Sequence, residues 1–435
     1  MGQGLHAGRV DVTANRTRLG AGRYQPMRAL PSGVSESTHS LKTQDDAKVD
    51  GVLRTVPGAR TVVCLMHPRQ DVTHHPLVPE LLARGFAVWT QGTRSVNNDI
   101  ALLHEQALLD VAAGQSFLRQ RDFEAVATLG HSGGGALFAY YHEQAGSPAA
   151  TRLVVGPGGR PTGFSEADLP VPDAAIFLAP HPGPGVLLLR MIDPSVIHEN
   201  DPLSIDPNLD PYSEANGFRA APQSSSYSPD FVARYRQAQR DRVARIDARA
   251  REWLDVVGDA KRRYERTRDP ADRRRALAPR VLITYRTDAD LRGVDLSLDQ
   301  NDRPYGSLFG RRPDLTNYGL VGFGRFTTPE AWLSTWSGLS SRADFLRCIP
   351  KVVAPTLLIE LTGDQASFPA DVGAIVEAHG AQDFTLARVA GTHFGGPLVP
   401  DGPTGNQLAA REIGGWLAQR FSTAPHPHIE DDPAG

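Results

Sequence analysis

The chain of 435 residues is long enough for one large core or two modest ones, and its 40% hydrophobic and 22% charged residues are typical of a globular protein. A formal net charge of −3 provides no overall attraction to nucleic acid or to an anionic membrane, so we expect neither as a partner. The two cysteines, Cys64 and Cys348, offer no disulfide framework, and no stretch approaches the roughly 18 apolar residues of a membrane span, so we expect a cytoplasmic protein.

Residues 1–36 are polar and rich in Gly and Arg, which predicts a flexible N-terminal arm. An organelle-targeting segment would have a similar composition, but no amphipathic helix is evident here. The next segments read as two strands around the turn signal Asp45-Asp46, followed by an apolar strand at 61–66. A helix at 74–85, a strand at 86–91 and a long helix from 98 to about 121 follow. Strands that alternate with helices at this pitch predict a mostly parallel sheet covered on both faces.

The stretch from Ala125 to Ala145 combines a strand, a sharp glycine-rich turn and a helix, with Ser132 at the apex of the turn. A serine on such a turn needs neighbours without side chains, because side chains there would collide with the strand or the helix. Gly130 and Gly134 are such neighbours. The N–H of Gly133 lies at the start of the helix, where the helix dipole and the unpaired amides favour a negatively charged oxygen.

This G-x-S-x-G turn between a strand and a helix resembles the nucleophile elbow of the α/β-hydrolase superfamily. The resemblance implies an α/β fold with a mostly parallel central sheet, helices on both faces and a large, mainly helical cap. It divides the chain into a first core part at 37–181, a cap at 182–350, a second core part at 351–421 and a C-terminal tail at 422–435.

The same resemblance implies a catalytic triad in the order Ser132, Asp364 and His393. Asp364 follows a buried strand after Thr-Gly, and His393 lies in the segment GTHFG beyond the last strand. Glu360 and Asp371 are near enough in sequence to be alternatives for the acid. A serine hydroxyl stays protonated at neutral pH, so it needs a neighbouring base, and the base needs a carboxylate that orients it.

In the superfamily, the loop after the first parallel strand carries His-Gly and then a residue whose backbone N–H forms half of the oxyanion hole. Here the loop reads His67-Pro68-Arg69, and proline has no N–H to donate. The resemblance therefore assigns the oxyanion hole to the N–H groups of Gly133 and Arg69. The Arg69 side chain could also bind an anionic substrate group, or could be a solvated loop residue.

Three histidines are candidate substrate contacts: His67, His131 and His181. His181 follows a strand end near the start of the cap. His131 lies inside the elbow, and we interpret its side chain as packing or lining the pocket.

The expected cap has little regular pattern. Between 230 and 275, basic and acidic residues are interleaved on a helical pattern, which is typical of a solvated helix and not of a nucleic-acid site. Five aromatic residues of this region could line an acyl pocket, although we favour the interpretation that they form a small core of the cap itself. These residues are Tyr305, Phe309, Tyr318, Phe323 and Phe326.

We hypothesise a serine hydrolase that cleaves a carboxylic ester of a small or medium-sized organic molecule through an acyl-enzyme on Ser132. The alternatives are the same triad acting on an amide, thioester, lactone or carbon–carbon bond, or a catalytically silent binding scaffold. No cofactor is expected. Asp71, His74 and His75 lie close together in sequence, but their spacing matches no metal motif. The oligomeric state is open, with a homodimer among the alternatives.

Overall fold

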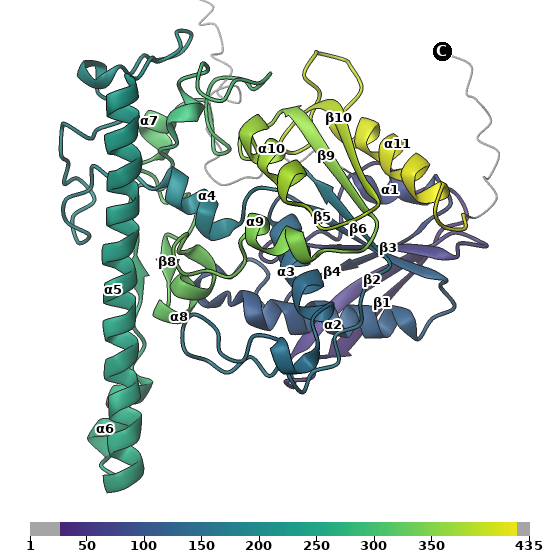
Figure 1. Ribbon diagram of the computed structural model, residues 1–435, viewed down its shortest axis with the longest axis horizontal. Helices are drawn as coiled ribbons and strands as arrows, with labels where there is room; N and C mark the ends of the chain where they lie inside the picture. Colours follow the sequence, from purple (N-terminus) through teal and green to yellow (C-terminus); the bar gives the residue numbers. More distant parts are fainter. Residues whose placement is uncertain (1–26, 424–435) are drawn as a thin grey trace, which may run out of the picture.

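The computed structural model describes residues 27–423. Most of the expected N-terminal arm, 1–36, and most of the expected tail, 422–435, therefore lie outside the described residues. An eight-stranded sheet forms the centre of the described chain (Figure 1). Its strands are β1 (Ser35–Lys42), β2 (Lys48–Thr55), β3 (Thr61–Met66), β4 (Ala87–Gln91), β5 (Ala125–His131), β6 (Ala174–Leu178), β9 (Thr356–Gly363) and β10 (Phe384–Thr392).

The strands lie in the order β1-β2-β4-β3-β5-β6-β9-β10. β2 is antiparallel to both of its neighbours, while the other five pairings are parallel, so the expectation of a mostly parallel sheet is confirmed. The hairpin expected around Asp45-Asp46 pairs Ser35 with Thr55 at one end and Lys42 with Lys48 at the other. β3, β5 and β6 are buried along their whole length, as is usual for strands covered on both faces.

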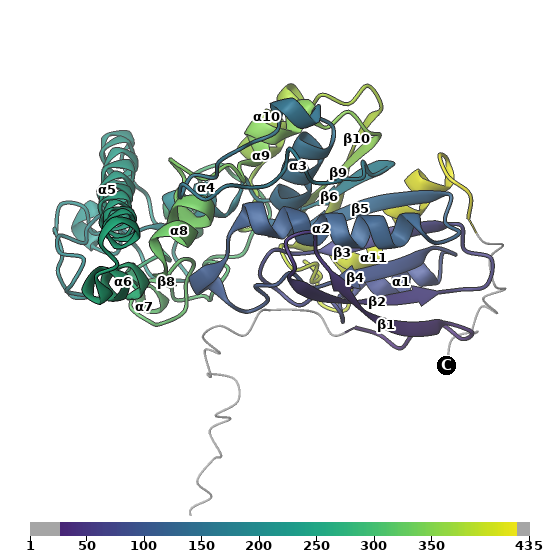
Figure 2. The same ribbon diagram turned by 90° about the horizontal axis from the view of Figure 1, so that it is seen from below.

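Helices cover both faces of the sheet (Figures 1 and 2). The helices are α1 (Leu77–Leu82), α2 (His104–Arg119), α3 (Gly133–Ala145), α4 (Pro184–Met191), α5 (Pro229–Thr267), α6 (Pro270–Leu277), α7 (Pro313–Thr316), α8 (Pro329–Ala331), α9 (Phe345–Cys348), α10 (Pro369–Ala378) and α11 (Gly405–Ala418). α2, α3, α9 and α10 pack on one face, and α1 and α11 pack on the other.

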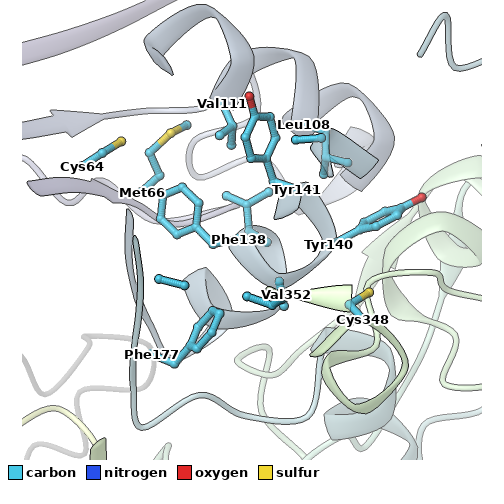
Figure 3. Close-up of a cluster of buried hydrophobic side chains, with 14 of the residues drawn as sticks. Cys64, Met66, Leu108, Val111, Phe138, Tyr140, Tyr141, Phe177, Cys348 and Val352 are labelled. Atoms are coloured by element: carbon cyan, nitrogen blue, oxygen red, sulfur yellow. The ribbon is translucent and has the colours of Figure 1, made fainter. Parts of the chain in front are cut away.

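Every residue of helix α3 is buried, and Figure 3 shows the cluster of apolar side chains to which the helix contributes. Its residues Phe138, Tyr140 and Tyr141 pack in one cluster with Leu108 of α2 and Phe177 of β6. Burying a large apolar side chain contributes about 1.5–3 kcal/mol, so this cluster fixes α3 firmly against the sheet. Because the elbow serine directly precedes α3, the same packing fixes the position of the serine.

Helix α2 begins later than the sequence predicts. The pattern indicated a helix from residue 98, but only a short 3₁₀ turn, Asp99–Ala101, lies there, and α2 starts at His104. The backbone between them is held by the cap: the N–H of Thr328 donates to the carbonyl of Ile100, and the hydroxyl of Thr335 donates to the carbonyl of Leu102. These contacts hold the segment outside the helix.

The insertion between β6 and β9 forms a second lobe beside the sheet, and its longest element is α5 (Figure 1). The Ser228 side chain caps α5 by accepting from the N–H of Phe231. The charged helix predicted here is confirmed, and its buried residues Val243, Ile246 and Ala250 pack against Trp332. Helix α9, although within the range 182–350, packs with the core cluster beneath α3. The two-residue strands β7 (Leu282–Ile283) and β8 (Phe326–Thr327) pair within this lobe.

Asp247 of α5 joins the long helix to the rest of this lobe. Its carboxylate accepts from the indole N–H of Trp332 at 2.7 Å and from the hydroxyl of Ser337 at 2.9 Å. The hydroxyl of Ser340 donates to the same carboxylate. Because the group is buried, each hydrogen bond compensates part of the cost of removing the charge from water.

We predict that Asp247→Asn lowers the free energy of unfolding by about 1–3 kcal/mol, because the three hydrogen bonds to this buried group lose the charge that strengthens them. Denaturant unfolding measures this change. The control is Asp259→Asn at an exposed position of the same helix, expected to change the value by less than about 0.5 kcal/mol. Equal effects of the two substitutions would contradict the anchoring role of Asp247.

Candidate active site

Ser132 lies between the end of β5 and the start of α3, at the apex of the turn expected from the sequence. Its backbone has φ 56° and ψ −120°, a conformation that L-residues rarely adopt. The surrounding packing over-determines this geometry, as is common where a side chain must be presented for chemistry. The N–H of Ser132 donates to the carbonyl of Leu178 on the neighbouring strand β6 at 3.1 Å, which fixes the turn.

Two glycines allow the chain to fold this tightly. A Cβ on Gly130 would lie 2.4 Å from backbone atoms of Gly134, and a Cβ on Gly134 would lie 2.4 Å from the carbonyl oxygen of Met66 on β3. Backbone atoms cannot move aside as a flexible side chain can. The helix α3 therefore approaches both β5 and β3 at distances that only glycine permits.

The serine, the histidine and the aspartate of the expected triad lie in hydrogen-bonding contact. The Oγ of Ser132 is 2.7 Å from Nε2 of His393. The Nδ1 of His393 is 2.8 and 2.9 Å from the two carboxylate oxygens of Asp364. Each of the three residues follows the end of a parallel strand, respectively β5, β10 and β9.

The carboxylate of Asp364 is itself held by the loop that follows it. Its Oδ1 accepts from the N–H of Ala366 at 2.6 Å and from the N–H of Ser367 at 3.0 Å. The amide of Asn301, from the insertion, donates to the carbonyl of Asp364 at 2.8 Å. Glu360, an alternative for the acid, instead pairs with Arg388. The orientation of Asp364 is therefore set by four hydrogen-bonding partners, His393 included.

A strained serine on a strand–turn–helix elbow, with a histidine and an acid at the same edge of a mostly parallel sheet, identifies the architecture. The chain has the α/β-hydrolase fold. The second alternative for the acid, Asp371, lies in α10 and pairs with Arg190 of the insertion, so in this hydrolase fold Asp364 alone of the three acids contacts His393.

No protein-family model matches the sequence, and no curated protein sequence matches it. Among solved structures, DcsB in complex with its substrate analogue is 12% identical over 89% of this chain and 100% of its own, with a TM-score of 0.47. The α/β hydrolase GrgF from Penicillium sp. is 12% identical over 89% and 99%, with a TM-score of 0.44. The esterase domain of a Rhodothermus marinus protein is 10% identical over 88% and 99%, with a TM-score of 0.41. The assignment of the hydrolase fold rests on the strand order and the elbow.

The expectation for Arg69 needs correction. Its backbone N–H donates to Nδ1 of His67 at 3.1 Å, and its guanidinium forms an ion pair with Asp99. Pro68 cannot donate, and the ring of His67 folds back over the loop and engages the next two amides, those of Arg69 and Gln70. The Arg69 amide is therefore not directed at the elbow, and its side chain lies in a wall of the site, near the rings of Phe323 and Trp336.

His67 and His181 both reach the elbow. The ring Nε2 of His67 lies 2.8 Å, and that of His181 3.1 Å, from the point that a Cβ on Gly133 would occupy. His67 directly follows β3, and His181 follows β6, and these two strands flank β5. Both of these candidate substrate contacts therefore lie beside the residue that follows the nucleophile.

His131 lines the narrow space at Ser132, and both of its ring nitrogens have hydrogen-bonding partners. Its Nε2 lies 2.7 Å from the backbone carbonyl of His393, and its Nδ1 lies 2.9 Å from Nε2 of His75. The N–H of Leu77 donates to Nδ1 of His75, so His75 donates in turn to His131, and His131 donates to the His393 carbonyl. His131 is a positioning residue for the loop that carries His393.

His75 was not a candidate site residue in the sequence, where it figured only in the excluded metal motif. Its partner, His131, is 56 positions away, so no local pattern could reveal the contact. Among residues 27–423, no group of three or more His, Cys, Asp or Glu side chains is arranged to hold a metal ion. None of the helices in this range is long and apolar enough to cross a membrane.

A cavity of about 600 Å³ lies between the core and the insertion. The space at Ser132 itself is narrow, about 10 Å³. Gln70 and Phe394 line both spaces and therefore lie between them. The cavity has a mainly apolar wall from the insertion and a polar wall from the core. Its residues are Arg69, Gln70, Asp71, Asn97, Asn98, Asp99, Ile100, Leu308, Phe309, Leu320, Val321, Gly322, Phe323, Arg325, Phe326 and Phe394.

Burial keeps the histidines around the elbow neutral. Desolvation and, second to it, the proximity of His393 lower the pKa of His181 to about 3 and that of His131 to about 4. Desolvation, followed by the charge of Arg69, holds the pKa of His67 well below its ordinary value. Away from the elbow, burial likewise lowers the pKa of His104 to about 3 and that of His142 to about 4.

These shifts predict that stability decreases in mild acid. In the unfolded chain the same histidines have a pKa near 6.5, so between pH 6.5 and about 4 the unfolded state binds protons that the native state does not. The free energy of unfolding therefore falls as the pH falls through this window, by about 1.4 kcal/mol per pH unit for each such histidine.

We expect His142→Gln to lower the slope of the unfolding free energy against pH by about 1.4 kcal/mol per pH unit, the contribution of one proton. His142 suits this test because its pKa is lowered by burial and its ring is bonded to Thr128, away from Ser132. Unfolding by denaturant at a series of pH values between 7 and 4.5 measures the slope for both proteins. An identical slope in the variant, or a wild-type stability that does not change over this range, would show that these histidines are not held neutral.

Proposed function

We propose that the protein is a serine hydrolase that cleaves a carboxylic ester of a small or medium-sized organic molecule. The observation that supports this most directly is the 2.7 Å contact between Ser132 Oγ and His393 Nε2, together with Asp364 on the other ring nitrogen. The carboxylate of Asp364 accepts a hydrogen bond from the Nδ1–H of His393, so the neutral ring presents an unprotonated Nε2 to the serine hydroxyl.

In the proposed reaction, Ser132 Oγ attacks the carbonyl carbon of the ester while His393 Nε2 takes the hydroxyl proton. The carbonyl oxygen becomes an oxyanion, and the N–H of Gly133 donates to it at the start of α3. When the oxyanion collapses, the bond to the alcohol breaks and His393 returns the proton to the leaving oxygen. A water, activated by the same histidine, then hydrolyses the acyl-enzyme and frees Ser132.

The cavity that shares Gln70 and Phe394 with the narrow space at Ser132 supports a substrate of moderate size. Its volume of about 600 Å³ is within the range of sites for small organic ligands. Phe309, Phe323 and Phe326 give it an aromatic wall, which suits an alkyl or aromatic acyl group. These side chains had a second interpretation as a core of the cap, and Phe309 and Phe323 do pack against each other at a centroid distance of 5.1 Å.

We predict that Ser132→Ala folds normally and loses nearly all hydrolysis of p-nitrophenyl esters, at least about 10⁴-fold in kcat. A fluorophosphonate probe should label the wild type at Ser132 and leave the variant unlabelled. Undiminished hydrolysis in the variant would refute the assignment of the nucleophile. Absence of labelling in the wild type would support the alternative of a binding scaffold.

We also predict that Leu320→Trp narrows the substrate range. Leu320 lines the cavity and is 79% exposed, so the larger ring fits without overpacking the core. The ratio kcat/KM should fall at least about tenfold for octanoyl esters and less than about threefold for acetyl esters. Leu339→Trp, at an exposed position outside the cavity, is the matched control. An equal loss for both chain lengths would contradict acyl binding in this cavity.

The same ester panel, extended to amides, thioesters, lactones and β-diketones, separates the remaining alternatives. All of these substrates react through attack on a carbonyl, so the triad alone does not distinguish them. The class with the highest kcat/KM identifies the bond that the enzyme cleaves. The proposal requires this class to be the esters.

A further inference from the structure

The second half of the oxyanion hole has no backbone donor where the sequence resemblance put one. The N–H of Arg69 is bonded to the ring of His67, and residue 68 is proline. One backbone amide, that of Gly133, is left to stabilise a developing negative oxygen beside Ser132. A single donor is a weak oxyanion hole, since each donor contributes a factor of about 10²–10³ to the rate.

The hydrogen bonds of His67 fix which ring nitrogen carries its proton. The N–H groups of Arg69 and Gln70 both donate to Nδ1, at 3.1 and 3.0 Å. Amide N–H groups only donate, so Nδ1 is unprotonated and the neutral ring carries its proton on Nε2. This Nε2 is the atom that lies beside Gly133.

His181 shows the same arrangement on the other side of the elbow strand. The N–H of Gly183 donates to Nδ1 of His181 at 3.1 Å, so this ring also carries its proton on Nε2. Within residues 27–423, neither this Nε2 nor that of His67 has a hydrogen-bonding partner. Both histidines are more than nine-tenths buried, and neither Nε2 is among the fully enclosed atoms that lack a partner, so each nitrogen keeps a small accessible surface.

Because Gly133 has no Cβ, there is an empty space beside it, and the Nε2 atoms of His67 and His181 both border this space. The helical backbone at this position does not require glycine, and alanine has the better helix propensity. A Cβ here would come within 2.8 Å of Nε2 of His67 and within 3.1 Å of Nε2 of His181. The space is therefore adjacent to three N–H donors, from β3, from α3 and from the segment after β6.

We propose that the Nε2–H groups of His67 and His181 donate to the carbonyl oxygen of the substrate as it becomes an oxyanion, together with the N–H of Gly133. This assignment deepens the proposed acyl transfer at Ser132 and rests on it. Uncharged donors suit this task, because they stabilise the oxyanion without placing a buried positive charge next to His393 in the resting enzyme. The two rings are then catalytic residues and not merely substrate contacts.

The first test measures acylation of the enzyme by p-nitrophenyl acetate, from the burst of p-nitrophenol. His67→Ala and His181→Ala should each slow acylation about 10²–10³-fold and change KM by less than about threefold. His142→Ala removes a buried neutral histidine that contacts Thr128, and it should acylate within about twofold of the wild type. Acylation within threefold of the wild type in both His67→Ala and His181→Ala would overturn the proposal.

A second readout separates oxyanion binding from a structural role. A trifluoromethyl ketone adds to Ser132 as a tetrahedral oxyanion, so its inhibition constant should rise in parallel with the loss of acylation rate across the variants. A structural role would weaken ketone and substrate binding alike, and this result would contradict the proposal.

Gly133→Ala tests the space itself. The added methyl group would occupy this space, so acylation should slow at least about 10²-fold while the variant stays folded. Gly373→Ala, in α10 where nothing lies within 4 Å of the new Cβ, is the control and should keep full activity. Full activity in Gly133→Ala would overturn the proposal.

Failure of this inference is distinguishable from failure of the proposed function. If the wild type labels at Ser132 and Ser132→Ala is inactive, the acyl-transfer assignment stands whatever the histidine variants do. If the wild type fails to label, the proposed function has failed, and the histidine assignment fails with it.

Discussion

The close approach of three backbone segments at the elbow is the constraint on which the rest of the site depends. β5, α3 and β3 meet at distances that exclude a Cβ on Gly130 or Gly134. This packing holds Ser132 in a backbone conformation that few residues adopt, and it directs the N-terminus of α3 toward the space beside the serine. The buried aromatic cluster under α3 stabilises the arrangement, so the strain is supported by the core of the whole domain.

Desolvation is the second physical factor. The elbow is surrounded by histidine rings that burial keeps neutral, and neutral rings each have one donor and one acceptor. Backbone amides and carbonyls decide which nitrogen has which role, so the loops around the elbow set the direction of every ring N–H. In this way His131 and His75 support the loop of His393, and His67 and His181 face the nucleophile.

The fold could be predicted because it depends on local patterns, and the order of Ser132, Asp364 and His393 followed from the resemblance of the elbow to that of the α/β-hydrolase superfamily. Alternation of strands and helices, a glycine-rich turn and polar residues just after apolar strands are all visible within short windows of sequence. The elbow is the clearest case, since the close approach of Gly130 to Gly134 lies within the turn itself.

Other features depend on contacts between distant segments. The prediction for Arg69 was wrong because the amides after Pro68 turn toward the ring of His67, which the spacing of residues does not reveal. Helix α2 starts later than predicted because hydrogen bonds from the cap hold the backbone carbonyls of Ile100 and Leu102. Much of the insertion is organised by buried polar groups, as where Arg286 contacts the carbonyl of Ser204 and the hydroxyl of Tyr318.

The central claim is that Ser132 attacks a carbonyl whose oxygen turns into the space beside Gly133. A crystal structure of the protein after reaction with a p-nitrophenyl phosphonate tests it most directly, because the phosphonyl group resembles the tetrahedral intermediate. We expect phosphorus bonded to Ser132 Oγ and a phosphonyl oxygen within about 3 Å of the Gly133 N–H and of Nε2 of His67 and His181. An adduct on another residue, or a phosphonyl oxygen that faces away from these groups, would contradict the account.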